Sequence, residues 1–571
     1  MASLRRRAQA LESRRGKEAP VRRPPPSHRH NGPSAPWPWI DLHDEIDQVQ
    51  LSSPLPPVPP TCDHKTCGGC WRGYPQSRFP NWTPSQLRRS RIHKAITEYN
   101  RAAPSMIHYV DVDANGLFTD SGKFVTTEET MGDFWDALIN ENTERPENIR
   151  VRALFIENMS GPVLQMLGAT YNIEPFFFSS SLGWIPSRYE EEVRPNQGDH
   201  ITITLTFLRT MDHPDASSLH TFPSGSASST MTSHYDRQNQ QVIDTQAPLF
   251  LHSSDHYLIL DLLAVHLIRS TDGNTIISYH NTDNDSTSAT YLHERIRFAG
   301  QSVYWQSIFQ KSPDPTFVLL TFIWHAMYAW DESLELLYTH ICYIETQVIT
   351  TSDLLLTREL HIIRAHHLHY SALLEDFRKA VDFVRETPNP AMDACPEAER
   401  VFSRNLLERE CKNLLSEIDR LEQGRKMQDK RLKNVMNLVF SSVNLDDSKR
   451  MQQLTEAAVR DSAAMKQIAY LSMIFLPASF VAAIFGMNIK EIVPETNGSL
   501  SHYFETAFPL TFITVWVVMA FQSKHLLGRD ATPTMRLFWP FSLARRMYWR
   551  RREQYQYRLN AAAPAGWDQK E

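Results

Sequence analysis

Two apolar runs near the C-terminus most constrain what this chain can fold into. Residues 468–487 contain no charged side chain, and residues 506–523 form a second uncharged run. At about 1.5 Å per residue, a helix of about twenty residues crosses the roughly 30 Å hydrocarbon core of a bilayer. A buried core helix would rarely need so long an uncharged stretch. The two runs predict a transmembrane hairpin with spans at 468–488 and 506–523 and an external loop at 489–505.

Basic residues predict how this hairpin is oriented. Arg450, Arg460 and Lys466 precede the first span, and a basic tail of residues 524–571 follows the second, whereas the loop between them is acidic. Positive charge favours the inner side of a membrane. Both termini are therefore expected in the cytoplasm, or in the matrix if the protein is mitochondrial. The plasma membrane is favoured, because prolines and acidic residues weaken the Arg-rich N-terminus as a mitochondrial presequence.

The N-terminal region is basic and rich in proline. Residues 1–30 hold eight arginines, and residues 1–60 hold twelve prolines. Such a composition cannot bury enough apolar surface to fold, so residues 1–104 are expected to form a disordered arm. The formal net charge of −6 gives no general signal for a nucleic-acid partner.

The region from 105 to 311 is expected to be an α/β or α+β cytosolic domain. Residues 106–113, 149–157 and 200–208 alternate apolar and polar side chains, as strands do. Helix-like segments lie between them. Residues 212–246 are rich in Ser, Thr and Gln and are expected to be a flexible insertion.

Long helices are predicted after this domain. Residues 312–395 are expected to form a long helical hairpin and residues 396–467 a stalk helix, because proline is absent from 397 to 476. Apolar side chains at 4-3-4-3 spacing predict a coiled-coil-like seam in the stalk, namely Leu407, Cys411, Leu414, Ile418 and Leu421.

Two groups of potential metal ligands occur outside the spans. Cys62, His64, Cys67 and Cys70 lie within nine residues and offer four soft ligands, so Zn²⁺ can be considered, although an adventitious thiol cluster is the alternative. The second group is a run of histidines that cannot all share one helical face, and packing is the simpler interpretation: His361, His366, His367 and His369.

The first span carries a family resemblance. The segment MKQIAYLSMIFLPASFVAAIFGMN, ending in Gly486-Met487-Asn488, resembles the first span of the CorA-type divalent-cation channels. FFFSSSLGWIPSRY, DHITITL and IRAHHLHYSALLEDFRKAV look like the fungal CorA-like branch. The resemblance extends over roughly residues 105–525, and a Zn²⁺-transporting ZntB-like branch is closely related.

This resemblance implies a funnel-shaped homopentamer in which the cytosolic domain regulates and the first span lines the pore. Six residues lie on one face of that helix at helical spacing, with Met465, Ile468 and Leu476 as apolar collars and Ser472, Ser479 and Ala483 as the smaller residues of the same face. As an alternative, the serines would only mediate helix contacts.

Gly486, Met487 and Asn488 are the expected selectivity filter. Mg²⁺ releases its waters reluctantly, so a ring of Asn488 amides suits a hydrated ion. Glu491 and Glu495 would concentrate cations at the external mouth. Asp446 and Asp447 are the stalk acids expected to sense cytosolic Mg²⁺.

Departures from the family pattern leave the ion open. Phe485 stands where Tyr is frequent, Ile489 where Phe is frequent, Ser479 replaces a usual Thr, and Leu476 a common Met. Mg²⁺ is the first expectation for the transported, and possible regulatory, ion, and Zn²⁺, Co²⁺ or Ni²⁺ are alternatives. The alternative to a channel is a membrane-anchored interaction protein that does not conduct ions. No nucleophile–base arrangement or phosphate loop indicates an enzyme.

Overall fold

The computed structural model describes residues 69–82, 84–212, 243–280, 287–350, 354–486 and 500–522, with isolated positions before 69 and parts of 538–552. The chain divides into two units, Met1–Ser442 and Val443–Glu571. Residues 213–242 of the expected flexible insertion and most of the expected arm before residue 69 lie outside the described residues.

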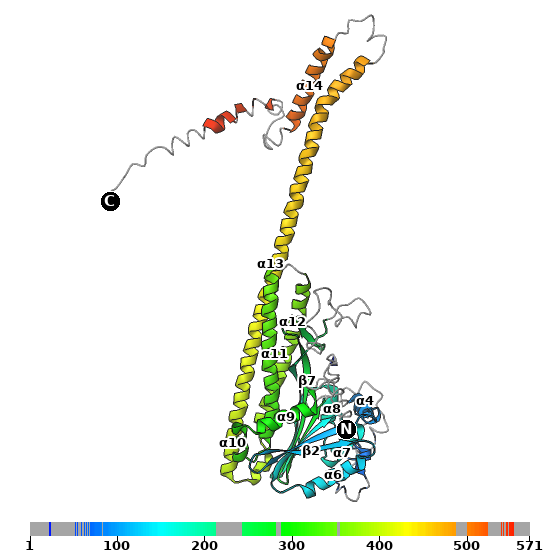
Figure 1. The fold of residues 1–571 in the computed structure, drawn as a ribbon, viewed down its shortest axis with the longest axis vertical. Helices are drawn as coiled ribbons and strands as arrows, with labels where there is room; N and C mark the ends of the chain where they lie inside the picture. Colours follow the sequence, from blue (N-terminus) through cyan, green and yellow to red (C-terminus); the bar gives the residue numbers. More distant parts are fainter. Residues whose placement is uncertain are drawn as a thin grey trace, which may run out of the picture. The chain divides into compact units, whose positions relative to one another are not determined.

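An eight-stranded mixed sheet forms the centre of the first unit (Figure 1). Its order is β2-β1-β3-β8-β7-β5-β4, and β6 pairs with β7. Only the β3–β8 pair is parallel among the described pairings. The strands are β1 (Ser105–Asp113), β2 (Phe118–Thr126), β3 (Ile149–Glu157), β4 (Ser187–Arg194), β5 (Gly198–Asp212), β6 (Leu249–Leu251), β7 (His256–Ser270) and β8 (Asn274–His280).

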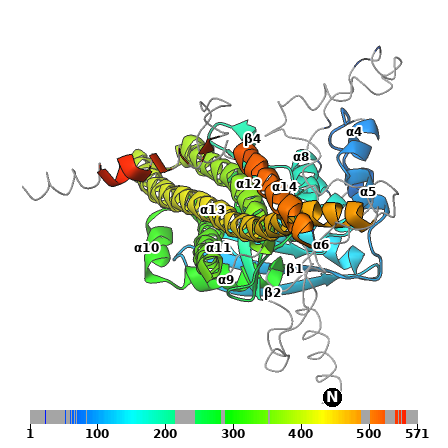
Figure 2. The same cartoon turned by 90° about the horizontal axis from the view of Figure 1, so that it is seen from above.

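Helices cover both faces of this sheet, so the unit has three layers (Figures 1 and 2). On one side α6 and α8 contact the strands and α7 lies beside α6, and on the other side α9, α11 and α12 contact the strands (Figure 1). The bounds of the helices in this unit before α13 are η2 (Cys70–Gly73), α4 (Pro84–Arg89), α5 (Ile92–Thr97), α6 (Met131–Glu144), α7 (Gly161–Thr170), α8 (Phe176–Gly183), α9 (Ala289–Gly300), α10 (Val303–Lys311), α11 (Thr316–Thr350), α12 (Leu354–Glu386) and η4 (Pro390–Ala394).

The alternation of side chains along β5 and β7 explains the two faces. His266 on β7 lies against Phe177 of α8, with ring centroids 5.3 Å apart. Arg269, three residues further along β7, points to the opposite face and contacts the start of α11 and the residue that follows α12. Successive residues of a strand point to opposite faces. Because both faces of the sheet are covered, the side chains of β5 and β7 are buried over most of the length of each strand.

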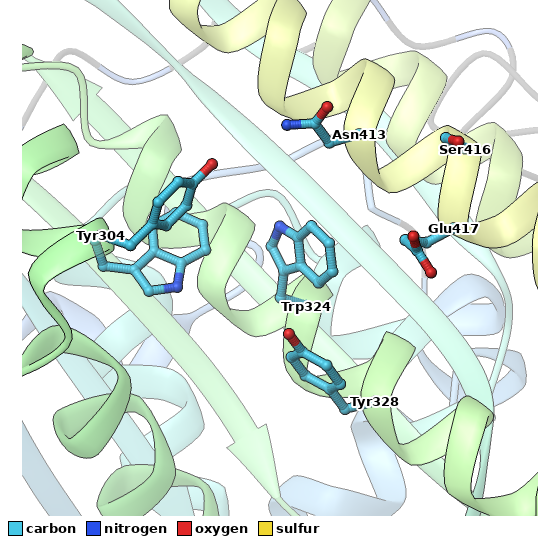
Figure 3. A pocket seen from close by; sticks show the side chains of 7 residues that line it. Tyr304, Trp324, Tyr328, Asn413, Ser416 and Glu417 are labelled. Carbon is cyan, nitrogen blue, oxygen red and sulfur yellow. The ribbon is translucent and has the colours of Figure 1, made fainter.

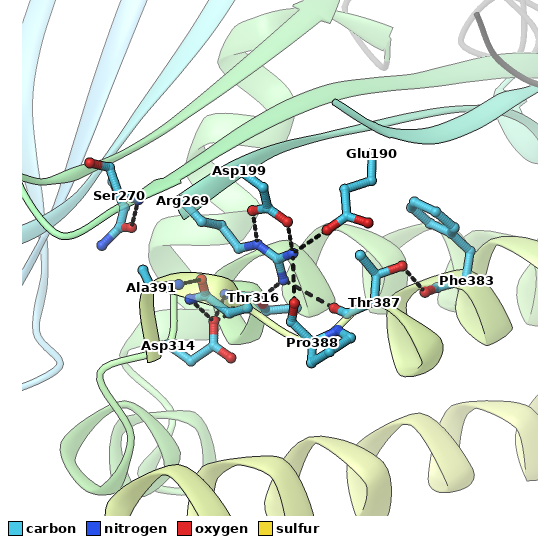
Figure 4. Close-up of polar contacts among 12 residues, drawn as sticks. Glu190, Asp199, Arg269, Ser270, Asp314, Thr316, Phe383, Thr387, Pro388 and Ala391 are labelled. Atoms are coloured by element: carbon cyan, nitrogen blue, oxygen red, sulfur yellow. Dashed lines mark hydrogen bonds and ion pairs between the residues drawn. The ribbon is translucent and has the colours of Figure 1, made fainter. Parts of the chain in front are cut away.

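Arg269 joins the sheet to the long helices (Figure 4). Its Nε donates to Asp199 Oδ1 at 2.6 Å, and its Nη2 makes a second bond to the same carboxylate. Nη1 donates to Thr316 Oγ1 and to the carbonyl of Thr387, both at 3.2 Å. A buried charge is tolerable only when it is paired and its remaining donors are satisfied, and both conditions hold here.

The three strands predicted from alternating side chains are confirmed. β3 has the predicted bounds, and β1 and β5 include the other two predicted strands. The mixed α/β domain followed by long helices is also the fold class expected from the sequence.

The N-terminal prediction is wrong for residues 70–97, which form η2, α4 and α5 instead of a disordered arm. Tyr74 is buried beneath α7, and its hydroxyl donates to the carbonyl of Ile173 at 2.7 Å. Gly168 makes room for this ring, because a Cβ at that position would lie 2.3 Å from Tyr74 Cζ. Aromatic packing thus fixes a segment whose upstream composition predicts disorder.

The helix α13 runs from Glu397 to Gly486, and its first part belongs to the first unit. There it packs on α11 and α12: Gln428 Nε2 donates to the carbonyl of Leu334 at 2.7 Å, and Arg431 pairs with Glu345. The residues of the predicted seam are all buried, namely Leu407, Cys411, Leu414, Ile418 and Leu421. Their partners therefore include helices of the same chain.

The second unit contains the remainder of α13 and α14 (Leu500–Gln522). Among the described residues one helix, Glu397–Ile484, includes a stretch that is long and apolar enough to cross a membrane. The apolar part of α14, Phe504–Ala520, is shorter.

Candidate functional site

The predicted pore face lies on the part of α13 in the second unit. Met465, Ile468 and Leu476 are each more than 60% exposed in the single chain. Ser472, Ser479 and Ala483 are exposed as well. Large exposed apolar surfaces mark contacts with lipid or with other protein chains. This part of α13 thus has the surface of a helix that is completed by a bilayer or by further subunits.

The hydroxyl of Ser479 is satisfied within its own helix. Ser479 Oγ donates to the carbonyl of Leu476 at 3.0 Å, close to Pro477, which has no N–H to donate. Because the proton of the hydroxyl is used in this bond, its lone pairs remain available as acceptors.

The predicted filter lies at the end of the described helix. Gly486 is the last residue of α13, and a Cβ there would meet no atom of the described residues within 4 Å. Met487, Asn488, Glu491 and Glu495 lie outside the described residues.

The stalk acids Asp446 and Asp447 lie on α13. Asp446 Oδ2 is 3.3 Å from Arg450 Nη2, four residues along the helix, and Asp447 is exposed. Neither acid belongs to a group of three or more potential ligands within the part of the chain that the structure describes. A metal held by them would therefore need ligands from elsewhere.

The structure brings the four residues of the Cys/His cluster together. The ligand atoms of Cys62, His64, Cys67 and Cys70 all lie within 4.8 Å of one another, and each residue is half-buried. In contrast, the histidines of α12 do not converge. His366 and His367 are buried, His361 is exposed, and His369 Nε2 lies 3.2 Å from Gln246 Nε2.

Sequence reasoning missed a second cluster, formed by Glu191, His200 and His266 on three neighbouring strands. His200 Nδ1 and His266 Nε2 lie 3.9 and 4.0 Å from Glu191 Oε1. Among the described residues neither nitrogen has a hydrogen-bond partner, and both nitrogens are buried. The other ring nitrogen of His266 lies 2.8 Å from Thr202 Oγ1, which fixes the orientation of the ring.

Burial sets the charge of this cluster. It lowers the pKa of His266 well below its usual range, with His200 as a further cause, and it lowers the pKa of His200. Burial, together with the nearby Glu174 carboxylate, raises the pKa of Glu191 well above its usual range. The cluster is therefore favoured as a neutral group of two imidazoles and a carboxylic acid in the absence of a cation.

The pairing register of the strands is the information that would have revealed this cluster. Glu191 is opposite His200 in the β4–β5 pair, and Thr202 is opposite His266 in the β5–β7 pair. His200 and Thr202 are two residues apart and share a face. The strand order, which the sequence pattern does not reveal, is needed to bring the three side chains together.

A pocket of about 370 Å³ lies between α10, α11 and α13 in the first unit (Figure 3). Tyr304, Trp324 and Tyr328 form its aromatic side, and Asn413, Ser416 and Glu417 form its polar side. With a single carboxylate, this lining lacks the ligand set of a metal centre.

Residues 249–522 match the family model described as CorA-like Mg2+ transporter protein. The complete CorA magnesium transporter of Methanocaldococcus jannaschii is 13% identical, with 72% of this chain and 96% of that chain covered and a TM-score of 0.37. The soluble domain of CorA from the same organism is 10% identical (59% and 96% covered, TM-score 0.35). The ZntB cytoplasmic domain of Vibrio parahaemolyticus is 9% identical (57% and 99% covered, TM-score 0.25).

A comparison with curated proteins gives no significant match. The assignment rests on the family model, whose region begins at β6 and ends with α14. It includes the long helices and both apolar runs, and it agrees with the resemblance drawn from the first span. The family consists of membrane transport proteins rather than enzymes. The chain therefore contains a CorA-like domain, which extends over residues 249–522.

Proposed function

We propose that this protein is a subunit of a membrane channel for divalent metal cations, with Mg²⁺ as the first candidate. The observation that carries the proposal is the family match, because it includes the apolar part of α13 and ends with α14. Zn²⁺, Co²⁺ or Ni²⁺ is the alternative cargo, since the same amide-ended span would also accept these ions in hydrated form.

In this proposal five copies of the chain surround one pore. Residues 468–488 and 506–523 span the bilayer, 489–505 form the external loop, and both termini are cytoplasmic. Residues 105–311 form the cytosolic domain, 312–395 the helical hairpin and 396–467 the stalk. The plasma membrane is preferred to the mitochondrial inner membrane, because acidic residues and prolines interrupt the basic N-terminus.

The described face of α13 suits the passage of a hydrated cation. Waters bound to a metal ion donate their protons outward. Ser479 Oγ, whose own proton is donated to Leu476, keeps its lone pairs free to accept them. Met465, Ile468 and Leu476 are apolar and would close the pore by excluding water when they approach one another.

Selectivity is assigned to a ring of Asn488 amides at the outer end of the span. An amide oxygen accepts from the waters around Mg²⁺ without a fixed charge that would trap the ion. Gly486 allows the backbones to turn or approach, and Met487 packs. Glu491 and Glu495 raise the local concentration of cations at the mouth.

The membrane potential would drive uptake. A divalent ion gains about 4.6 kcal/mol per 100 mV, twice the value of about 2.3 kcal/mol for one charge. Cytosolic metal would close the channel by binding acids of the stalk, with Asp446 and Asp447 as the first candidates. Since the part of the chain that the structure describes places no third potential ligand beside these two acids, the remaining ligands would come from a neighbouring subunit.

Ion flux into liposomes containing the purified full-length protein tests the proposal. Wild-type protein should admit Mg²⁺ when the interior is negative, and Asn488→Ala should abolish the preference for Mg²⁺. Asn497→Ala, the same change in the same loop, serves as the control and should conduct normally. Flux of Zn²⁺ with and without a pH gradient distinguishes the alternative cargo. Pentamers that pass neither ion would instead indicate the membrane-anchored interaction protein.

A further inference from the structure

The Cys/His cluster directly precedes, and partly overlaps, the segment that packs on α7. Cys70 begins η2, and Cys62, His64 and Cys67 precede it. Four residues later Tyr74 is buried under α7, and Gln165 of α7 donates to the carbonyl of Tyr74 at 3.0 Å. The cluster is thus held next to a firmly packed part of the first unit.

The distances within the cluster fit a tetrahedral site. Zinc bonds to sulfur at about 2.3 Å and to imidazole nitrogen at about 2.0 Å, so ligand atoms around one ion lie roughly 3–4 Å apart. His64 Nδ1 lies 3.2 Å from Cys70 Sγ, and all four ligand atoms lie within 4.8 Å of one another. Little movement would be needed to enclose an ion.

Two backbone features of the described residues are compatible with such a site. Gly69, directly before Cys70, has a φ of 98°, which residues other than glycine rarely adopt. The backbone N–H of His64 points to Cys62 Sγ at 3.4 Å. A hydrogen bond of this kind stabilises a thiolate, which is the form of cysteine that binds metal.

The composition of the cluster favours a metal over a disulfide. The three cysteines are free, and a bond between any two of them would leave the third and His64 without a role. Three cysteines and one histidine, in contrast, are a complete ligand set for structural zinc. With four protein ligands, no position stays open for a water or a substrate.

The imidazole of His64 is positioned by α6. Its ring lies edge-on against Trp135, with centroids 5.6 Å apart, and Trp71 lies against the same indole at 6.1 Å. A metal held by His64 and the cysteines would therefore attach the chain before η2 to the α6–α7 side of the sheet.

We propose that Cys62, His64, Cys67 and Cys70 bind one structural Zn²⁺ ion that fastens the N-terminal segment to the cytosolic domain. This ion is resident and distinct from the transported cation, so the proposal stands whether or not the channel function does. Because the free energy of metal binding adds to the free energy of folding, such a site would stabilise the docked position of the segment that begins at Cys62.

Metal analysis of the purified full-length protein in detergent, after washing with excess Mg²⁺ and a weak chelator, tests the site. We expect about one zinc ion per chain in the wild type and none in a Cys67→Ser/Cys70→Ser variant. Cys342→Ser/Cys395→Ser, a matched change of two other free cysteines, should retain the ion. Cobalt(II) in place of zinc should give the absorption of a tetrahedral thiolate complex in the wild type.

Limited trypsin digestion gives a readout that does not depend on the variants. Removal of zinc from the wild type by a strong chelator should open cleavage at Lys65 and Arg72, and added Zn²⁺ should restore protection. Wild-type protein that retains no zinc and gives no cobalt–thiolate absorption overturns the proposal. Zinc that persists in Cys67→Ser/Cys70→Ser but is lost in His266→Phe also overturns it, because the ion then belongs to the cluster of Glu191, His200 and His266.

Discussion

Arg269 on β7 and Asp199 on β5 form a bidentate ion pair whose two side chains are completely buried. The same guanidinium reaches the first turn of α11 at Thr316 and the carbonyls of Thr387 and Pro388 that follow α12. Three segments that are distant in the sequence therefore share one charged group. The pair connects the sheet to the helices of the CorA-like domain.

Asp199→Ala should destabilise the first unit strongly. Removing one partner leaves a buried charge uncompensated, which costs about 3–5 kcal/mol, and the lower end is expected because Glu190 lies 3.9 Å from Arg269. Asp393→Ala breaks an exposed pair with Arg400 and should cost less than about 1 kcal/mol. Denaturant unfolding followed by tryptophan fluorescence compares the two. Equal losses would contradict the structural role of the buried pair.

Gly168→Ala should loosen the N-terminal segment. The new Cβ would collide with the buried ring of Tyr74, and overpacking of this kind costs about 1–3 kcal/mol. Gly424→Ala is the matched control, because nothing lies within 4 Å of its added Cβ and alanine favours the helix by about 0.5–1 kcal/mol. Thermal unfolding should therefore shift in opposite directions for the two variants. A Gly168→Ala protein as stable as the wild type would show that Tyr74 is not seated there.

Acidification should destabilise the packing of α12. Burial, with His369 as a further cause, lowers the pKa of His366 to about 4, whereas an unfolded histidine titrates near 6.5. The stabilising contribution is complete above about pH 6.5 and is lost as the pH falls towards 4, because only the unfolded chain takes up the proton. Over this window His366 contributes roughly 3 kcal/mol. Thermal unfolding at several pH values measures the loss.

His366→Phe keeps an aromatic ring next to Tyr370 but cannot be protonated. Its stability should therefore depend less on pH than that of the wild type. His361→Phe changes an exposed histidine of the same helix and should leave the pH dependence unaltered. An unchanged profile in His366→Phe would assign the acid sensitivity to other groups.

Ser479→Ala should slow ion flux while leaving the protein folded. The alanine removes an acceptor from the proposed pore face, and a lost hydrogen bond of about 1.4 kcal/mol corresponds to about a tenfold change. Ser441 on the same helix also donates to a carbonyl, that of Asn437 at 2.9 Å, and Ser441→Ala should conduct normally. Liposome flux assays distinguish the two. Equal flux through both variants would support the interpretation of Ser479 as a helix-contact residue.

The sequence predicted those elements whose pattern is local. Ile149–Glu157 alternates and is rich in branched side chains, and it forms β3 with these bounds. The segment that begins at Glu397, which contains no proline before Pro477, forms one helix. The four residues of the Cys/His cluster are neighbours in the sequence, and for this reason they could be found as a group before the structure was known.

Features that depend on strand order or on docking could not be predicted in this way. Glu191, His200 and His266 meet only because β4, β5 and β7 are adjacent in the sheet. Residues 70–97 follow a proline-rich region, and their order comes from Tyr74 and its neighbours packing on helices that are about a hundred residues away. No local composition signals such a contact.

The packing of Tyr74 against Gly168 also sets a practical limit for work on the first unit alone. A fragment that starts at residue 105, where the first strand begins, would lack the Tyr74 ring that packs against Gly168. The surface of α7 around Gly168 would then be exposed to water. Soluble pieces intended for crystallisation or calorimetry should instead start ahead of Cys62. Expression trials that ignore this boundary are expected to yield aggregates.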